Sequence, residues 1–338
     1  MPAGVSARPA LDGRHLYLAL RDGTVSAYAL ETGAVVWTTR SPVVVPPLAT
    51  GGLVLAIGAD LVEALSADDG TVRWRTPLAS PPSAAGALVN GRLVLGLQSA
   101  DVVNLDPATG TVLWRTNLGA PLSAPPAGDE RRLLCGLVDG RVVAVSPDTG
   151  QLEWSQKTGD AIAGLALESD RVYAGSRDNY FYSLVSGSGR LDWKWRTGGD
   201  IVGEPAFDRD RVYFASLDNL LRALDRKHGA QQWKRSLRSR PLGGPAVVGE
   251  AVMVAGFAAE IRTHWVSDGR AVDRIATDAE LAAPLVVLPR AWPRVGGLAV
   301  VTSAGQLLLL VERIDPEVLP FKAPVGEELA LTAPPELP

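Results

Sequence analysis

A segment that ends in Trp recurs along the chain at nearly constant spacing. One copy spans residues 144–154, AVSPDTGQLEW, in which an Ala and a polar turn ending in Thr-Gly precede the Trp. Five related segments end at Trp37, Trp74, Trp114, Trp193 and Trp233. In chain order the six Trp residues are 37, 40, 40, 39 and 40 positions apart. A fixed period of about 20 to 50 residues is typical of solenoids and propellers, so one repeating unit determines the fold.

Each unit reads as four short strands. The first strand is built from small residues and Pro, which suits strands that converge on a crowded axis. Its eight copies begin at Arg8, Pro47, Ala84, Ala124, Gly164, Glu204, Gly244 and Ala283. Asp-Gly and Asp-Asn turns, such as Asp139-Gly140 and Asp178-Asn179, then join the second strand to the third. These patterns predict an all-β, eight-bladed β-propeller of four-stranded antiparallel blades.

The Trp on the fourth strand has a predicted mechanical role. A blade cannot bury both of its faces alone, so the ring is expected to pack over the turn of the neighbouring blade. The Ala of the motif is expected to leave space opposite the ring, and the Gly to provide a left-handed turn.

The last two units depart from the motif. Asp273 replaces the Trp in the seventh unit, and in the eighth Asp315 and Leu319 stand where Gly and Trp are expected. The outer strand of the last blade is predicted to come from either residues 317–322 or the N-terminal residues 5–8. Residues 1–322 are then a single propeller, and residues 323–338 a Pro-rich acidic tail.

Composition limits the function classes. Apolar residues make up 46% of the chain, which is enough for a continuous core, and the net charge of -4 gives no reason to expect nucleic acid or an acidic membrane as a partner. No run approaches the roughly 18 apolar residues of a membrane helix. Cys135 is the single Cys and lies in an apolar strand pattern, so it is predicted to be a buried hydrophobe. We expect a monomer, which is cytoplasmic if Met1 is the true start and periplasmic if a signal peptide was removed.

Catalytic signatures do not emerge from the sequence. Walker, GxGxxG, HExxH and GxSxG motifs are missing, and His15, His228 and His264 are mutually remote. The sequence therefore predicts a protein without catalytic residues, metal ligands or a cofactor.

A cationic stretch interrupts this acidic chain. Residues 226–240, RKHGAQQWKRSLRSR, contain six Lys and Arg residues and no acidic residue. Arg235, Leu237, Arg238 and Arg240 fall at its end, in and before the predicted loop between two blades. Two interpretations stay open, a solvated charged face and a partner-binding patch.

A second departure is Glu204, the only acidic residue in a first-strand core. Asp160 and Asp200 lie in matching connecting loops just before two first strands. These carboxylates are either ordinary solvated groups or a polar mouth of the central channel.

The AxDxxTGxxxW core of the unit resembles the pyrroloquinoline-quinone-type repeat of eight-bladed propellers, and the resemblance covers residues 8 to about 322. Two groups share this repeat. The quinoprotein alcohol dehydrogenases are much longer and typically use a Cys–Cys clamp, which a chain with one Cys cannot form. The BamB-like proteins of the bacterial envelope are non-enzymatic and assist outer-membrane protein assembly, and a Leu- and Arg-rich loop is implicated in their docking to the assembly barrel protein.

The resemblance therefore implies an interaction scaffold of the cell envelope, with an outer-membrane assembly barrel protein as its partner. A small quinoprotein-like oxidoreductase and a ligand-sensing propeller are the alternatives.

Overall fold

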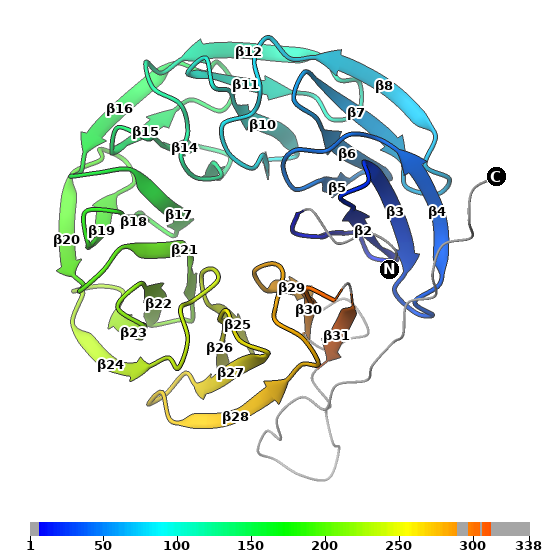
Figure 1. The fold of residues 1–338 in the computed structure, drawn as a ribbon. Coiled ribbons are helices and arrows are strands. Elements are labelled where there is room, and N and C mark those ends of the chain that lie inside the picture. The colour runs from blue at the N-terminus through cyan, green and yellow to red at the C-terminus, as the bar shows by residue number, and fades with distance from the viewer. Residues whose placement is uncertain (1–6, 289–296, 305, 312–338) are drawn as a thin grey trace.

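The computed structural model describes residues 7–288, 297–304 and 306–311, whose regular secondary structure is entirely β-strand. The strands form seven four-stranded sheets and one three-stranded sheet. In each sheet consecutive strands pair antiparallel in chain order. The sheets stand in a ring, with the first strand of each at the centre and the fourth at the rim (Figure 1).

The blades are numbered along the chain. Blade 1 contains β1 (Ala10–Leu11), β2 (His15–Ala19), β3 (Thr24–Ala29) and β4 (Val35–Arg40). Blade 2 contains β5 (Leu48–Thr50), β6 (Leu53–Ile57), β7 (Leu61–Ser66) and β8 (Val72–Pro77). Blade 3 contains β9 (Ala87–Val89), β10 (Arg92–Gly96), β11 (Asp101–Leu105) and β12 (Val112–Asn117). Blade 4 contains β13 (Ala127–Gly128), β14 (Leu133–Gly136), β15 (Arg141–Val145) and β16 (Leu152–Lys157).

The second half of the ring follows the same order. Blade 5 contains β17 (Ile162–Glu168), β18 (Arg171–Ser176), β19 (Tyr180–Val185) and β20 (Leu191–Arg196). Blade 6 contains β21 (Ile201–Phe207), β22 (Arg211–Ser216), β23 (Leu220–Asp225) and β24 (Gln231–Ser236). Blade 7 contains β25 (Ala246–Val248), β26 (Ala251–Ala255), β27 (Glu260–Trp265) and β28 (Ala271–Ala276). Blade 8 contains β29 (Val286–Leu288), β30 (Gly297–Val301) and β31 (Leu307–Val311).

Four-stranded blades are thus confirmed for seven units, whereas the described part of the eighth has three strands. Residues 317–322, one predicted source of its outer strand, lie outside the described residues, as does the predicted tail 323–338. In the other predicted source, residues 5–8, only residues 7 and 8 are described. An outer strand lies at the rim of the ring, whereas Arg8 lines the central channel. The prediction that residues 5–8 supply the outer strand was therefore wrong for Arg8.

Eight hydrophobic clusters hold the ring together, and each combines side chains from two neighbouring blades. One cluster joins Leu16 and Leu18 of blade 1 to Val286 and Ala299 of blade 8, which closes the ring. Cys135 is fully buried in the cluster between blades 3 and 4, as predicted. Burial raises the pKa of its thiol to about 12, so this sulfur is unreactive in the folded chain.

The six repeat Trp residues form a staple between blades, which confirms the predicted docking role. Each indole Nε1–H donates to a backbone carbonyl in the β-turn of the next blade, at 2.8–3.3 Å. The motif Gly of that turn has a φ of +69° to +72°. A Cβ on it would lie 2.4–2.6 Å from the docked ring, so Gly is required by both its backbone conformation and the close contact. Across the strand pair, Ala faces the Trp in four blades, and Asn104 and Ser183 do so in the other two.

Small residues at the centre let the inner strands approach one another closely. A Cβ on Gly164 would lie 2.1 Å from the carbonyl oxygen of Gly203, and one on Gly244 would lie 1.9 Å from that of Glu204. The predicted crowding of the first strands is therefore confirmed where blades 5, 6 and 7 meet.

Candidate functional site: the central channel and the connecting-loop face

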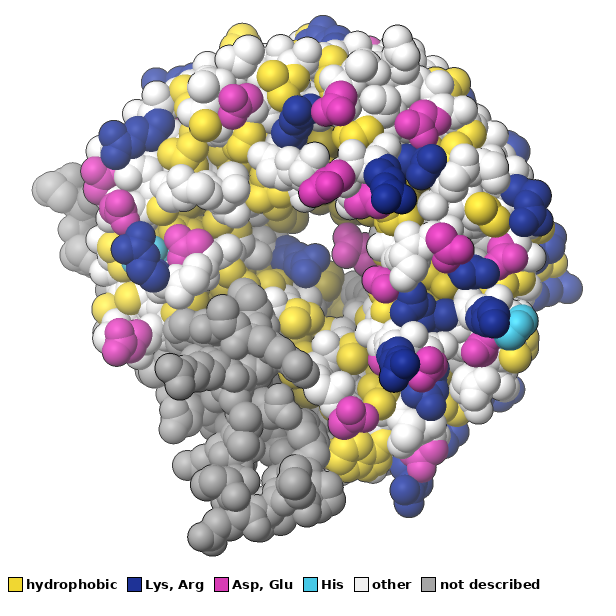
Figure 2. Space-filling model, turned by 180° about the vertical axis from the view of Figure 1, so that it is seen from behind, with side chains coloured by type: hydrophobic (Ala, Val, Ile, Leu, Met, Phe, Trp, Pro, Cys, Tyr) yellow, Lys and Arg dark blue, Asp and Glu magenta, His cyan; other side chains and the backbone are white. Residues whose placement is uncertain are grey.

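Two cavities lie along the centre of the ring. The first has a volume of about 560 Å³ and the second about 490 Å³. Both are lined by Arg8, Pro46, Ala85, Pro125 and Glu204, so they meet at this level and form one channel. The space-filling view shows the opening, with a basic side chain at one edge and an acidic side chain at the other (Figure 2).

A β-bulge presents Glu204 to the channel. On β21, Val202 pairs with Ala215 and Ala206 pairs with Tyr213, so the intervening residues outnumber those on β22. Gly203 starts this bulge with a φ of +67°. Bulges often re-aim a side chain next to a functional site. Here the bulge exposes the Glu204 side chain to the channel.

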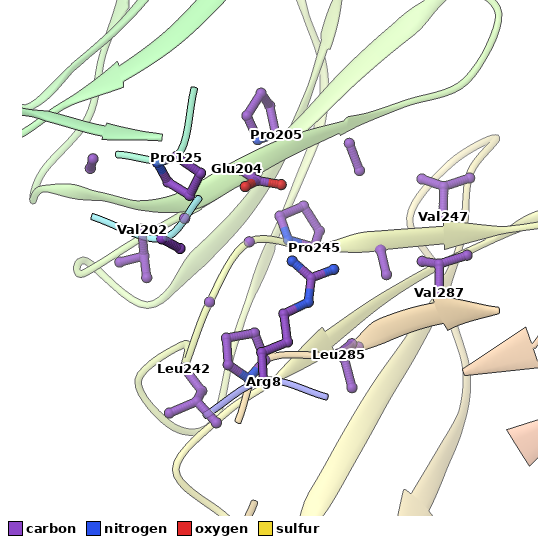
Figure 3. Close-up of a pocket in the computed structure, with 18 of the residues that line it drawn as sticks. Arg8, Pro125, Val202, Glu204, Pro205, Leu242, Pro245, Val247, Leu285 and Val287 are labelled. Carbon is purple, nitrogen blue, oxygen red and sulfur yellow. The ribbon is translucent and has the colours of Figure 1, made fainter. Parts of the chain in front are cut away.

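Arg8 is the counterpart of Glu204 in blade 1. Ala10 pairs with Tyr17 just as Ala206 pairs with Tyr213, so Arg8 and Glu204 occupy the same position of two units. Figure 3 shows the Arg8 guanidinium extending into the pocket toward the Glu204 carboxylate, among Pro and aliphatic side chains. Within the described residues, neither side chain has a hydrogen bond or an ion pair. Among the described residues that line the channel, Arg8 is the one basic and Glu204 the one acidic side chain, and the rest of that wall is mostly apolar.

Asp160 and Asp200 are not brought to this channel. Neither belongs to the residues that line the two cavities. Their backbone carbonyls accept hydrogen bonds from the second and third strands' side of blades 5 and 6: the carbonyl of Asp160 accepts from the Ser176 hydroxyl at 2.9 Å, and that of Asp200 accepts from Leu217 N–H at 2.8 Å. Both residues lie on the connecting loops, so of the three predicted carboxylates only Glu204 lines the channel.

The cationic stretch separates into residues with different environments. Arg235 is on β24, two positions after Trp233, and its Nε donates to the carbonyl of Gly269 in blade 7 at 2.8 Å. Leu237 is 8% exposed and packs in the cluster between blades 6 and 7. Arg238 and Arg240 are exposed, and their guanidinium groups have no hydrogen bond or ion pair in the described part of the chain. Arg235 and Leu237 thus stabilise the junction, and Arg238 and Arg240 are the side chains available to a partner.

An exposed aromatic residue stands beside these arginines. Phe257, in the turn between β26 and β27, is 56% exposed, and its N–H donates to the carbonyl of Arg240 at 3.0 Å. Arg238, Arg240 and Phe257 are called the loop patch below. They lie on the face that carries the connecting loops between blades.

The described residues do not assemble a recognisable cofactor or metal site. No group of three or more His, Cys, Asp and Glu within them could hold a metal ion. A polycarboxylate quinone in the channel would find one cation, Arg8, and would place a carboxylate near Glu204, so the wall fits that group poorly. His264, one of the three mutually remote His residues, is 4% exposed inside β27. Burial lowers the pKa of its imidazole, which remains neutral.

Two residues of the site were missed from the sequence, Arg8 and Phe257. Arg8 could have been found, because it is the only basic residue that begins any of the eight first strands. Phe257 carries no signal of its own, because an apolar residue in a strand-rich chain is expected to be buried.

Comparisons with known proteins agree with the architecture. A family model described as outer membrane protein assembly factor BamB matches residues 1–122, 58–162 and 138–318. Among curated proteins none matches this sequence. No helix in the described ranges has the length and apolar character needed to cross a membrane.

Three solved structures resemble the chain closely in shape. BamB from Moraxella catarrhalis has a TM-score of 0.76 at 21% identity, covering 90% of this chain and 95% of that one. The computationally designed Ika8 protein has a TM-score of 0.75 at 16% identity, covering 91% and 96%. Saccharomyces cerevisiae Sqt1 has a TM-score of 0.80 at 10% identity, with the same coverage of 91% and 96%. A fold shared at such low identities does not indicate function, but the family model matches most of the sequence, and the chain therefore belongs to the BamB family of β-propeller proteins.

Proposed function

We propose that this protein is a non-enzymatic interaction scaffold of the bacterial cell envelope that acts in the periplasm in outer-membrane protein assembly, similar to BamB. The proposal rests on the family match together with one observation, the loop patch. Arg238 and Arg240 are exposed and unpaired in the described structure, and the backbone of Arg240 is hydrogen-bonded to that of the exposed Phe257. Arg and aromatic residues dominate binding energy at protein interfaces.

The ring gives this patch a rigid support. The loop before β25 begins next to Leu237, which is anchored in the core between blades 6 and 7. Arg235 and Trp233 tie the same strand to blade 7 through the carbonyls of Gly269 and Val266. Because little ordering is needed when the partner binds, the entropic cost of docking is small.

The chemistry of the patch specifies the partner surface. A guanidinium binds a carboxylate through two parallel hydrogen bonds, a geometry that the Lys ammonium cannot reproduce. We therefore expect an acidic surface with an apolar pocket for Phe257 on the partner. The proposed partner is the periplasmic part of an outer-membrane assembly barrel protein.

The test is the affinity of the purified protein for the periplasmic domains of that barrel protein. Arg238→Glu together with Arg240→Glu should weaken binding by about a hundredfold or more, because favourable charge pairs become repulsive. Wild-type affinity should also fall as the salt concentration rises. Stability should change by only about 0.5 kcal/mol, because both side chains are exposed.

A matched control is Arg131→Glu with Arg190→Glu. These arginines are also exposed, but they lie in the turns before β14 and β20, on the opposite face of the ring. This control should leave affinity unchanged. Equal binding by wild type and the Arg238/Arg240 variant, or equal losses in both double variants, would reject the loop patch as the docking surface.

A further inference from the structure

The central channel carries an inference that is independent of docking to a protein partner. Of the described residues, two charged ones line it: Arg8 and Glu204, which come from blades 1 and 6 and project into the same space (Figure 3). No ion pair joins them, although both lie in the described residues. Opposite charges held apart in one cavity form a complementary pair of sites for a ligand that bears both charges.

The rest of the wall is apolar and stiff. Pro46, Pro125, Pro205, Pro245 and Pro284 line the first cavity, with aliphatic side chains such as Leu242 and Leu285. Pro rings have little conformational freedom, and these lie in or just before the inner strands, so the cavity is largely pre-formed. A volume of about 560 Å³ lies within the range of roughly 300–1,000 Å³ found for small-molecule sites.

The charge pattern excludes simpler ligands. A free anion such as phosphate would be attracted by Arg8 but repelled by Glu204, and the reverse holds for a metal cation. A neutral apolar molecule would displace water from both charged groups without replacing its hydrogen bonds, which is unfavourable. A zwitterion with an apolar body satisfies both charges and the wall.

We propose that the channel binds a short apolar peptide with free termini. Its C-terminal carboxylate would accept hydrogen bonds from the Arg8 guanidinium, and its N-terminal ammonium would donate to the Glu204 carboxylate. Apolar peptide side chains would lie against the Pro-rich wall. Terminal carboxylates and amines are recurrent recognition elements in peptide-binding proteins.

The experiment uses the dipeptide Leu-Leu as the probe, with isothermal titration calorimetry on the full chain. Wild type should bind Leu-Leu with one site per molecule. N-acetyl-Leu-Leu and Leu-Leu amide should each bind about tenfold more weakly or worse, because each lacks one charged hydrogen-bonding terminus. Failure of wild type to bind Leu-Leu, or equal binding of a doubly blocked Leu-Leu, would overturn the proposal.

Two variants assign each terminus to its residue. Glu204→Gln should weaken the binding of Leu-Leu about tenfold but leave the affinity for N-acetyl-Leu-Leu unchanged. Arg8→Gln should likewise weaken the binding of Leu-Leu about tenfold but leave the affinity for Leu-Leu amide unchanged. Arg131→Gln, outside the channel, is the control and should bind like wild type. If blocking the matching peptide terminus weakens binding by the same factor in the variant as in wild type, the proposed assignment of that terminus to that residue is wrong. If a variant does not fold, the blocked peptides still test the proposal on wild type alone.

Discussion

Blades 6 and 7 have the same inner packing but different rims. On β24, Trp233 is 6% exposed and its Nε1 donates to the carbonyl of Val266 in the next blade at 3.0 Å. On β28 the same position is Asp273, which is exposed and faces Thr263 across the strand pair. Both blades nevertheless contribute to a hydrophobic cluster shared with the next blade. The ring is therefore held by its interior at every junction, and the Trp staple adds to some junctions only.

The hairpin turns show the same contrast between these blades. In blade 6, Asp218 accepts hydrogen bonds from the N–H of Gly198 in the preceding loop, at 2.9 Å, and from the buried Arg222. In blade 7 the equivalent turn position is occupied by Ala258, which has no carboxylate to form this link. Blade 7 therefore contributes neither a repeat Trp nor a turn carboxylate of its own, and its turn carries the exposed Phe257. The loop patch therefore lies at the junction of blades 6 and 7, which Trp233 and Arg235 stabilise, and the repeat Trp is missing from the following junction, between blades 7 and 8.

The largest predicted difference is between the two rim positions themselves. Trp233→Ala should lower the free energy of unfolding by about 3–5 kcal/mol, through lost burial and the cavity that remains. Asp273→Ala should change it by only about 0.5 kcal/mol, because the side chain is exposed. Urea denaturation of the two variants measures this difference. Similar losses of unfolding free energy in the two variants would mean that the docked Trp adds no stability beyond that of the interior hydrophobic clusters.

Glycine substitutions separate backbone strain from the docking contact. Gly91→Ala introduces a side chain at a φ of +70° with no atom within 4 Å, so it should cost about 1–2 kcal/mol through strain alone. Gly269→Ala has a φ of +71°, and its Cβ would also lie 2.6 Å from the Trp233 ring. It should cost about 1–3 kcal/mol more than Gly91→Ala, because the ring must move. Gly13→Ala has neither effect and is the control. Equal losses of unfolding free energy in Gly91→Ala and Gly269→Ala would contradict the close contact between Gly269 and the Trp233 ring.

The smallest effect concerns the pH dependence of the Asp218 link. Burial by itself would raise the pKa of Asp218, but the hydrogen bonds from Arg222, Ser216 and Gly198 outweigh it and lower this pKa from 3.8 to about 2. Because the folded-state pKa is depressed, the stabilisation of about 2 kcal/mol is fully present above the unfolded-state pKa and is lost as the pH falls from about 4 to 2. Asp218→Asn should therefore be less stable than wild type at pH 7, and the gap should shrink over this acidic range. A gap that stays constant down to pH 2 would show that the charge of Asp218 contributes nothing.

Most of the fold could be predicted because its determinants repeat. The Trp, the Gly and the small first strands each recur along the chain, so a single local pattern fixes the docking geometry of every junction that contains it. The rim of blade 8 could not be predicted, since Asp315 and Leu319 no longer follow the pattern, and these residues lie outside the described ranges.

The site was harder to predict, because it depends on contacts between distant residues. Glu204 was noticed from its position in the unit, but it shares a channel with Arg8 only because the ring brings blades 1 and 6 together. The sequence also could not show which arginines of the cationic stretch are held by a neighbouring blade and which are free to bind a partner. Arg235 resembles Arg238 as a residue type, and only the neighbouring blade supplies the carbonyl of Gly269 that occupies its guanidinium.

The most direct measurement is a hydrogen-exchange footprint of the periplasmic domains of the assembly barrel protein on the wild-type ring. The proposed docking predicts protection of residues 237–240 and 256–258, on the connecting-loop face, and no change in residues 129–131 and 187–190 on the opposite face. Protection of the opposite face alone, or no protection at saturating partner, would contradict it.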